Sequence, residues 1–220
     1  MGRRARTPVL HAIYQRYVAD QDCARFGNAV GRRYTIATLE RLAAAGDRMT
    51  RRAAVLALSL MADYNSNVTL GKALHDVDRG VRMLAENGIQ QIWHRAGSPR
   101  DQKRLRRIVE LIGAKRLSEA LELATRFIDE APWLPESWNQ RAIALFRLGR
   151  YAHSIRDCKA ALEMNPYHFA AAAGLGQCYL KMNNRPAALE CFRRALEINP
   201  SLEGIRAQVL YLQRALKRQQ

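Results

Sequence analysis

Two stretches of the chain, Ala-Leu-Glu-Met-Asn-Pro at residues 161–166 and Ala-Leu-Glu-Ile-Asn-Pro at residues 195–200, are copies of each other at a 34-residue spacing. Pro132 precedes Pro166 by the same spacing, so three copies of one unit follow each other. Proline cannot donate a backbone hydrogen bond and disfavours helix in the residue before it, so each proline ends a helix. A repeat of this length is one helical hairpin that stacks on its neighbours. The sequence therefore predicts an all-α fold, a right-handed α-α superhelix (alpha-solenoid) of stacked antiparallel hairpins.

Each copy also has a polar break between two apolar runs. The break is Leu-Gly-Arg at 148–150 in the middle copy and Met-Asn-Asn at 182–184 in the third. Both supply the Gly or Asn that a helix C-terminus favours in left-handed conformation. Small residues recur at 34-residue spacing at Ala120, Ser154 and Ala188, where we expect the two helices of a hairpin to approach closely.

These residues resemble the tetratricopeptide repeat. The middle copy has the Trp of that signature, and the third has its Leu-Gly, Tyr and Ala-x-x-x-Phe elements. The resemblance implies three repeats, at 101–134, 135–168 and 169–202, although the first copy lacks the Trp, Gly and Tyr positions. The structural repeat positions are Ala120, Pro132, Trp138, Ser154, Pro166, Gly176, Ala188 and Pro200.

A second, 31-residue period precedes these copies. It relates Asp47 to Asp78 and Arg51 to Arg82. The frame resembles two short HEAT repeats of the kind found in bilin-lyase-like proteins, at residues 34–95. An Asp at a helix N-terminus caps free amides, so we expect Asp47 and Asp78 to be caps and the arginines to bond across to the next hairpin.

The remaining segments complete the predicted layout. Residues 1–33 form a basic N-terminal helical arm, a joint lies near residues 96–99, and residues 203–220 form a capping helix with a basic tail. Solenoids require such caps at their ends. No stretch approaches the about 20 apolar residues of a membrane span, and the apolar run at 8–14 is short for a secretory signal. We expect a cytoplasmic protein.

The net charge of +16 is unevenly distributed. Residues 1–52 carry +7, residues 95–116 carry +6 and residues 117–205 are neutral. Such an excess of Arg attracts an anionic partner, which could be nucleic acid, acidic protein or anionic lipid. Aromatic residues interleave with arginines in the arm, as in base-stacking surfaces, or else pack inside the arm while the arginines stay solvated. The candidate anionic-partner surface comprises Arg16, Arg25, Arg32, Arg33, Arg51, Arg52, Arg100, Lys103, Arg104, Arg106 and Arg107.

The tetratricopeptide resemblance implies a groove lined by the first helix of each hairpin, at repeat positions two, five, nine, twelve and thirteen. An apolar or helical peptide would fit it, unless the C-terminal helix covers it. The chaperone-binding subtype clamps a C-terminal carboxylate, but its positions here hold Leu105, Val109, Ala170 and Gly174, so we expect no clamp. The candidate groove residues are Glu136, Asn139, Ile143, Phe146, Arg147, Ala170, Ala173, Gln177, Leu180 and Lys181.

No catalytic motif is apparent, and we expect no cofactor or metal. The four cysteines have no C-x-x-C spacing, which favours burial as small hydrophobic residues over a disulfide or metal site. The sequence thus favours a non-enzymatic scaffold or adaptor for protein partners. An RNA- or ribosome-associated accessory protein is the main alternative, and a lyase or chaperone for a small cofactor is a further one.

Overall fold

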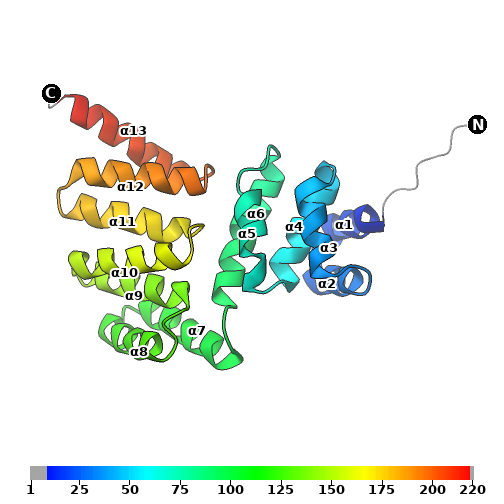
Figure 1. Cartoon of the computed structure of the whole chain (residues 1–220), viewed down its shortest axis with the longest axis horizontal. Helices are drawn as coiled ribbons and strands as arrows, with labels where there is room; N and C mark the ends of the chain where they lie inside the picture. The colour runs from blue at the N-terminus through cyan, green and yellow to red at the C-terminus, as the bar shows by residue number, and fades with distance from the viewer. Residues whose placement is uncertain (1–8, 219–220) are drawn as a thin grey trace, which may run out of the picture. The chain divides into compact units, whose positions relative to one another are not determined.

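The computed structural model describes residues 9–218, and within that range the chain forms thirteen α-helices, one short 3₁₀ turn and no strand (Figure 1). Residues 1–8 of the predicted arm and residues 219–220 of the predicted tail lie outside the described residues. The helices fall into two compact units, one up to Ile92 and one from Trp93 onward. No helix between residues 9 and 218 has the length and apolar character to cross a membrane. The predicted all-α class is confirmed.

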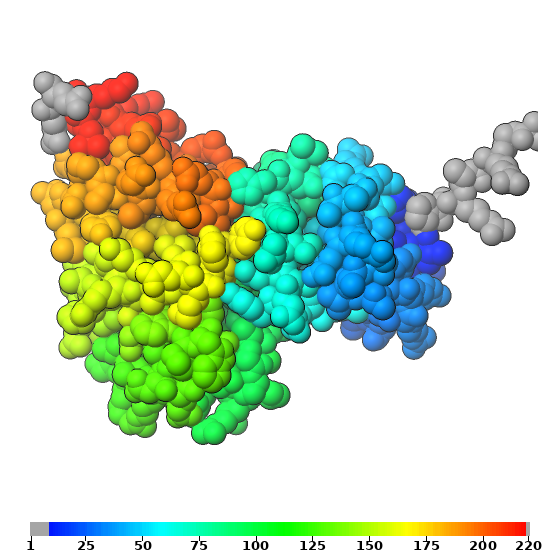
Figure 2. Space-filling model, in the orientation of Figure 1, coloured from blue at the N-terminus to red at the C-terminus, as the bar shows by residue number. Residues whose placement is uncertain are grey.

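The second unit consists of three hairpins and a terminal helix. Its elements are α7 (Pro99–Gly113), α8 (Leu117–Glu130), α9 (Pro135–Arg147), α10 (Tyr151–Met164), α11 (Phe169–Lys181), α12 (Arg185–Ile198) and α13 (Glu203–Lys217). Each helix packs against the next along the chain, and α9 also contacts α7 and α11. In the space-filling view, side chains close the gaps between the ribbons of α10 to α13 (Figure 2). The predicted solenoid of hairpins is confirmed here.

One turn geometry closes all three hairpins. Lys115, Gly149 and Asn183, which follow the 34-residue period, have φ of 60°, 76° and 59°. Each donates its N–H to the carbonyl three residues earlier, at 3.0–3.1 Å, and the following residue donates to the carbonyl five residues earlier, at 2.9 Å. This is the Schellman arrangement, which satisfies the last carbonyls of a helix. The first copy therefore turns as the others do, although it has Lys where Gly and Asn favour the conformation.

Tight contacts join the two helices within each hairpin. Ala120, Ser154 and Ala188 are all buried, as their spacing predicts. The Ser154 hydroxyl donates to the Ala142 carbonyl at 2.8 Å, which ties α10 to α9. The small side chains allow the helices to approach, and the hydroxyl has a partner although it is buried.

The third hairpin has its closest contact at Gly176. A Cβ atom placed there would lie 2.4 Å from the Phe192 ring, so only glycine fits beside this aromatic side chain. At the equivalent positions, the middle copy has Ala142 with Cys158 and the first copy has Ile108 with Ala124, all of them buried. Each hairpin thus fills the same layer of its core with a different division of volume between the two helices.

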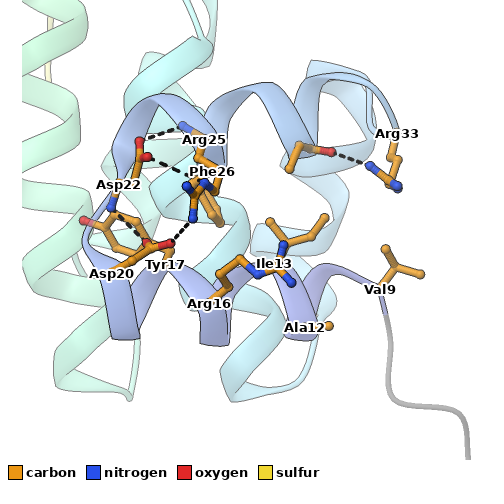
Figure 3. A pocket seen from close by; sticks show the side chains of 11 residues that line it. Val9, Ala12, Ile13, Arg16, Tyr17, Asp20, Asp22, Arg25, Phe26 and Arg33 are labelled. Carbon is orange, nitrogen blue, oxygen red and sulfur yellow. Dashed lines mark hydrogen bonds and ion pairs between the residues drawn. The ribbon is translucent and has the colours of Figure 1, made fainter.

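The first unit begins with a short hairpin. Its elements are α1 (Val9–Asp20), α2 (Cys23–Gly31), α3 (Ile36–Ala45), α4 (Arg48–Met61), the 3₁₀ turn η1 (Tyr64–Ser66), α5 (Asn67–Ala73) and α6 (Arg79–His94), the last two residues of α6 belonging to the second unit. The Tyr17 and Phe26 rings lie against each other, with centroids 5.3 Å apart (Figure 3). Tyr14 joins them at 6.3 and 6.4 Å. Tyr14 and Phe26 are buried, so these aromatic residues form the core of the arm.

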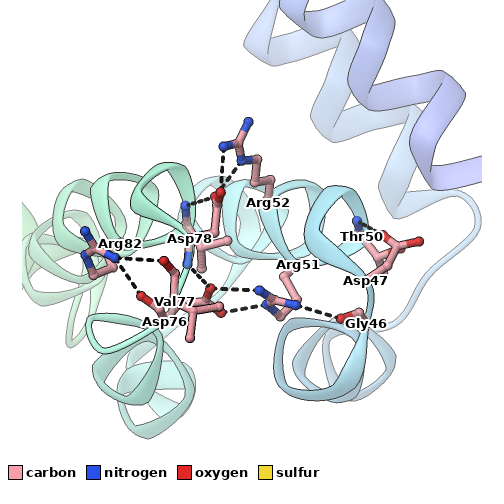
Figure 4. Close-up of polar contacts among 10 residues, drawn as sticks. Gly46, Asp47, Thr50, Arg51, Arg52, Asp76, Val77, Asp78 and Arg82 are labelled. Carbon is pink, nitrogen blue, oxygen red and sulfur yellow. Dashed lines mark hydrogen bonds and ion pairs between the residues drawn. The ribbon is translucent and has the colours of Figure 1, made fainter.

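The 31-residue period is visible in the polar contacts of α4 and α6 (Figure 4). Asp47 accepts the Thr50 N–H at 2.8 Å, and Asp78 accepts the Val81 N–H at 3.0 Å, so both predicted caps are confirmed. Arg51 donates to the Gly46 carbonyl, and Arg82 donates to the Val77 carbonyl, so this contact recurs with the same period. The HEAT-like resemblance itself stays a prediction.

Two arginines of α4 reach the segment that leads into α6. Arg51 donates to both carboxylate oxygens of Asp76 at 2.6 and 2.9 Å, and Arg52 does the same to Asp78 at 2.6 and 2.8 Å (Figure 4). Gly80 makes room for the second pair, because a Cβ there would lie 2.6 Å from Arg52 Nε. These bidentate pairs hold α4 to the start of α6.

The cysteines are free thiols. Cys158 and Cys178 are buried, Cys191 is half-buried and Cys23 is exposed. Burial raises the pKa of the Cys158 thiol to about 12. Small-hydrophobe packing is thus confirmed for Cys158 and Cys178.

Gly176→Ala should destabilise the third hairpin by about 1–3 kcal/mol, because the new methyl group would overlap the Phe192 ring. Gly204→Ala is the matched control, since a Cβ at this helical glycine would meet nothing within 4 Å. We expect the control to be neutral or slightly stabilising. Urea unfolding followed by circular dichroism measures both. Equal stability of the two variants would contradict the close packing of α11 on α12.

Arg52→Leu should lower the unfolding free energy near neutral pH by roughly 2 kcal/mol, and the difference from wild type should narrow as the pH falls. The hydrogen bond from Arg52 is the largest cause that lowers the pKa of Asp78 to about 2. The unfolded carboxyl titrates near pH ~3.9. Because the folded pKa is the lower one, the stabilisation is complete above the unfolded pKa and is lost as the pH falls toward about 2. Urea unfolding at a series of pH values tests this.

The matched control for this experiment is Arg79→Leu, which removes a neighbouring, exposed arginine at the start of α6. The control should shift stability little and leave its pH dependence unchanged. If the difference in unfolding free energy between wild type and Arg52→Leu stays constant from neutral pH down to about 3, the Arg52–Asp78 pair does not have the assigned role.

Candidate functional site

The candidate groove residues divide into two sets by exposure. Ile143, Phe146 and Leu180 are half-buried apolar residues, as are Ala170 and Ala173. Gln177 is half-buried and polar, and Arg147 and Lys181 are exposed. Glu136 and Asn139, by contrast, are 4% and 5% exposed. Because both side chains are buried, the expectation that these two face a ligand does not fit the structure.

Glu136 lies at the centre of a buried polar cluster. Its carboxylate accepts from the Asn139 amide at 3.1 Å, from the Gln140 amide at 2.6 Å, and pairs with His168 Nε2 at 2.9 Å. The other ring nitrogen of His168 accepts the Ala171 N–H, so the Nε2 atom carries the proton and donates to Glu136. Burial would raise the pKa of Glu136, but the hydrogen bond from His168 lowers it, and the net shift is downward.

The end of α6 covers this cluster. The Trp93 indole stacks on the His168 ring with centroids 4.2 Å apart, and it lies 5.3 Å from the Phe169 ring. His94 Nε2 lies 3.7 Å from a Glu136 carboxylate oxygen. Within the second unit, therefore, residues that precede the first hairpin close the N-terminal ends of α9 and α11. The sequence carries one sign of this arrangement, a His at position 168 where the preceding copy has Leu134.

The terminal helix packs on the last hairpin. Val209 and Leu212 of α13 form a core cluster with Phe192 of α12, and Leu180 packs partly against this cluster. Phe146 packs instead on the core of the middle hairpin, with its ring 5.5 Å from that of Tyr151. The alternative that α13 covers the groove thus applies to Leu180 and not to Phe146 or Ile143.

What is left is a strip along the first helices of the hairpins, which we call the groove surface. Repeat position nine holds Val109, Ile143 and Gln177, and Val109 is 38% exposed. Position thirteen contributes Arg147, which donates to the Ile112 carbonyl of α7 at 2.8 Å and so links two hairpins. The groove surface comprises Val109, Ile143, Phe146, Arg147, Ala170, Ala173, Gln177 and Lys181.

The arm presents a second hollow. A cavity of about 250 Å³ lies between α1 and α2, with an apolar floor that includes Ile13 and Phe26. Arg16, Arg25 and Arg33 line it, so three predicted anionic-partner residues border the same cavity at different points (Figure 3). Asp20 and Asp22 also line this cavity, and Arg25 bonds Asp20 at 3.0 Å. Arg32 of the predicted surface is exposed but is not part of the lining.

The other predicted basic residues differ in whether an acidic side chain of the protein already pairs with them. Arg51 and Arg52 are held by Asp76 and Asp78 and have side chains 17% and 31% exposed, which corrects the view that they serve an external anion. On α7, Arg104 pairs with Glu130 at 2.6 Å.

Four more basic residues of α7 belong to the predicted surface, and two of them have acidic neighbours. Arg107 pairs with Glu110 at 3.1 Å, and Arg100 lies 3.9 Å from a Glu130 oxygen. Lys103 and Arg106 are exposed. These two glutamates therefore neutralise part of the positive charge of α7.

A further cavity of about 300 Å³ lies in the HEAT-like segment, lined by residues of α3 and α5 and by Asp76. Two of its acidic groups are already engaged, since Glu40 accepts from the Ser66 hydroxyl and Asp76 holds Arg51. In the part of the chain from 9 to 218, His, Cys, Asp and Glu side chains form no group of three that could hold a metal ion.

Comparison with known proteins agrees with the hairpin geometry. Residues 133–201 match the family model described as tetratricopeptide repeat. A TPR repeat-containing protein of Rhizobium etli is 30% identical over 123 residues, which are 56% of this chain and 60% of that protein. A Protein SGT1 homolog of Bos taurus is 31% identical over 96 residues, covering 44% of this chain and 28% of the relative. The chain thus spans less than two thirds of either relative.

Two solved structures share the fold. The first TPR of Spaghetti (RPAP3), bound to HSP90 peptide SRMEEVD, gives a TM-score of 0.52 at 22% identity and covers 55% of this chain and 96% of that one. The Sgt2 TPR domain from Aspergillus fumigatus gives 0.52 at 21% identity, covering 56% and 82%. The repeat geometry, the family match and these relatives agree that residues 133–201 form tetratricopeptide repeats.

Proposed function

We propose that this protein is an interaction scaffold that holds an apolar or helical segment of a partner protein on its groove surface. The observation that carries this is the phase of the partly exposed apolar side chains, since Val109 and Ile143 occupy the same repeat position on neighbouring helices. Phe146 lies one turn further along α9. An amphipathic helix presents its apolar residues at three- and four-residue spacing, which suits such a strip.

The polar residues of the groove surface would orient the ligand. Arg147 and Lys181 are exposed at repeat position thirteen, and Gln177 occupies in the third copy the position that Val109 and Ile143 hold in the other two. Because Asn139 is buried against Glu136, it does not take part. The ligand is therefore held mainly by apolar contact, with charge at one end of the strip.

A clamped C-terminal carboxylate is not the proposed ligand. The fold neighbour, the first TPR of Spaghetti (RPAP3), is bound to the HSP90 peptide SRMEEVD. In this chain the clamp positions that the tetratricopeptide resemblance implies hold Leu105, Val109, Ala170 and Gly174, and Leu105 is 3% exposed. None of these side chains can donate a hydrogen bond to a carboxylate. Recognition would depend on internal apolar residues of the partner.

The arm cavity between α1 and α2 is the better-supported place for an anionic partner. Arg25 is paired with Asp20, but Arg16 and Arg33 also line the cavity beside its apolar floor, so an anionic group attached to an apolar body would suit it. An RNA-associated role has less support, because Tyr14 and Phe26 are 8% and 2% exposed and offer little surface for base stacking.

Val109→Glu combined with Ile143→Glu should weaken binding of an amphipathic helical peptide by at least about tenfold, because two carboxylates would enter the apolar strip. The peptide is selected from a displayed helix library on the full chain, and affinity is measured by fluorescence anisotropy. Val77→Glu is the control, since Val77 is 90% exposed and lies far from this strip in the sequence. Selected helices that bind the double variant as well as wild type would place the ligand elsewhere.

The same fluorescence anisotropy assay tests whether the protein recognises the C-terminal carboxylate of a peptide. SRMEEVD with a free C-terminus and its C-terminal amide should bind equally weakly, because no side chain at the clamp positions recognises the carboxylate. A free acid that binds about tenfold more tightly than the amide would contradict the proposed mode.

A further inference from the structure

A third cavity lies outside the groove surface, on the side of the second unit where α8, α9 and α10 meet. Its volume is about 500 Å³, in the range of small-ligand and peptide side-chain pockets. Leu121, Trp138 and Leu145 give it an apolar floor. The lining is completed by Thr125, Arg141, Arg150, His153, Arg156 and Asp157. We call this cavity the outer pocket.

Hydrogen bonds and an ion pair hold several lining side chains of the outer pocket in place. Arg141 donates to both carboxylate oxygens of Asp157 at 2.7 and 2.9 Å, and Asp157 is 4% exposed. The Arg141 guanidinium lies 5.1 Å from the centre of the Trp138 ring, and the Trp138 N–H donates to the Pro132 carbonyl at 2.8 Å. The one acidic group in the lining is therefore neutralised, and the remaining charged groups at the rim are basic.

Comparison of the three copies shows that the fold does not require these basic residues. Arg150, His153 and Arg156 of the middle copy correspond, one 34-residue period later, to Asn184, Ala187 and Glu190. In the first copy the corresponding residues are Arg116, Glu119 and Glu122.

The charges of the first copy are satisfied internally, because Arg116 pairs with Glu119 and Glu122 pairs with Arg126. In the middle copy, His153 and Arg156 replace those two glutamates. The same hairpin scaffold thus forms with Arg or Asn at the position of Arg150, and with an acidic residue in place of Arg156 in both other copies. Folding gives no reason for a rim of Arg150, His153 and Arg156.

We propose that the outer pocket binds an acidic segment of a protein partner, in which an apolar side chain enters the pocket and flanking carboxylates pair with Arg150 and Arg156. The apolar floor under a basic rim gives the required complementarity. Nucleic acid fits less well, because residues 117–205 have no net charge and the basic rim is confined to one hairpin. This site is separate from the groove surface, so a partner could engage both.

The test uses the full chain and three labelled probes. One is a short peptide with two leucines between pairs of glutamates, one is the same peptide with glutamine for every glutamate, and one is a single-stranded oligonucleotide of matching charge. The variant Arg150→Asn/Arg156→Glu installs the residues that the third copy carries at the same places, so the fold should be retained. The control Arg193→Glu/Arg214→Asn makes an equal change in charge at exposed positions of α12 and α13.

We expect the glutamate peptide to bind wild type at least about tenfold more tightly than the glutamine peptide, with an affinity that falls between about 50 and 200 mM salt. Arg150→Asn/Arg156→Glu should lose most of this difference, whereas the control and the groove variant Val109→Glu/Ile143→Glu should keep it. A failure of the groove proposal would leave this result untouched.

Three results would overturn the proposal. Equal affinity for the two peptides would remove the role of charge. Unchanged affinity in Arg150→Asn/Arg156→Glu would move the site elsewhere. If the oligonucleotide binds more tightly than the glutamate peptide, and Arg150→Asn/Arg156→Glu abolishes that binding, the pocket would be assigned to nucleic acid.

Discussion

The second unit depends on the left-handed turn that joins the two helices of every hairpin. A helix that ends at a Schellman turn has its last carbonyls satisfied and reverses within a few residues. In this protein the turn residue recurs once in each copy, at Lys115, Gly149 and Asn183. Because the turn fixes the position of the second helix along the first, it also fixes which side chains meet between them. The contacts of Gly176 with Phe192 and of Ser154 with Ala142 follow from that register.

Much of this repeat structure could be predicted from the sequence, because each backbone conformation that it requires favours particular residue types. The prolines, the Gly and Asn residues of the turns and the small residues at 120, 154 and 188 each reflect one steric requirement. The left-handed conformation of Lys115 could not be predicted in this way, because the hairpin imposes it against the preference of lysine. The caps Asp47 and Asp78 were equally readable, because a cap is made with residues a few positions away.

The polar groups of the candidate sites were less predictable. Repeat position alone assigns Glu136 and Asn139 to the groove, but both are buried, with Glu136 bonded to His168 from 32 residues away in the sequence. Arg51 and Arg52 read as surface charge, and their partners are 25 and 26 residues away in the sequence. A pairing of that kind depends on the packing of helices, so composition and spacing overestimate the charge that is available to a partner. The outer pocket could not be predicted from the sequence for the same reason, because its residues come from three helices.

The unequal division of volume within the hairpins has a consequence for how such arrays diversify. Phe192 needs Gly176, whereas Cys158 is matched with Ala142, so the two helices of a hairpin are adapted to each other more than to a common pattern. Duplication of whole hairpins keeps these matched pairs together. A crossover within a hairpin would join the first helix of one copy to the second helix of another, which leaves either a void or an overlap in the core. Recombination at the prolines between hairpins would keep together the pairs that are matched within each hairpin.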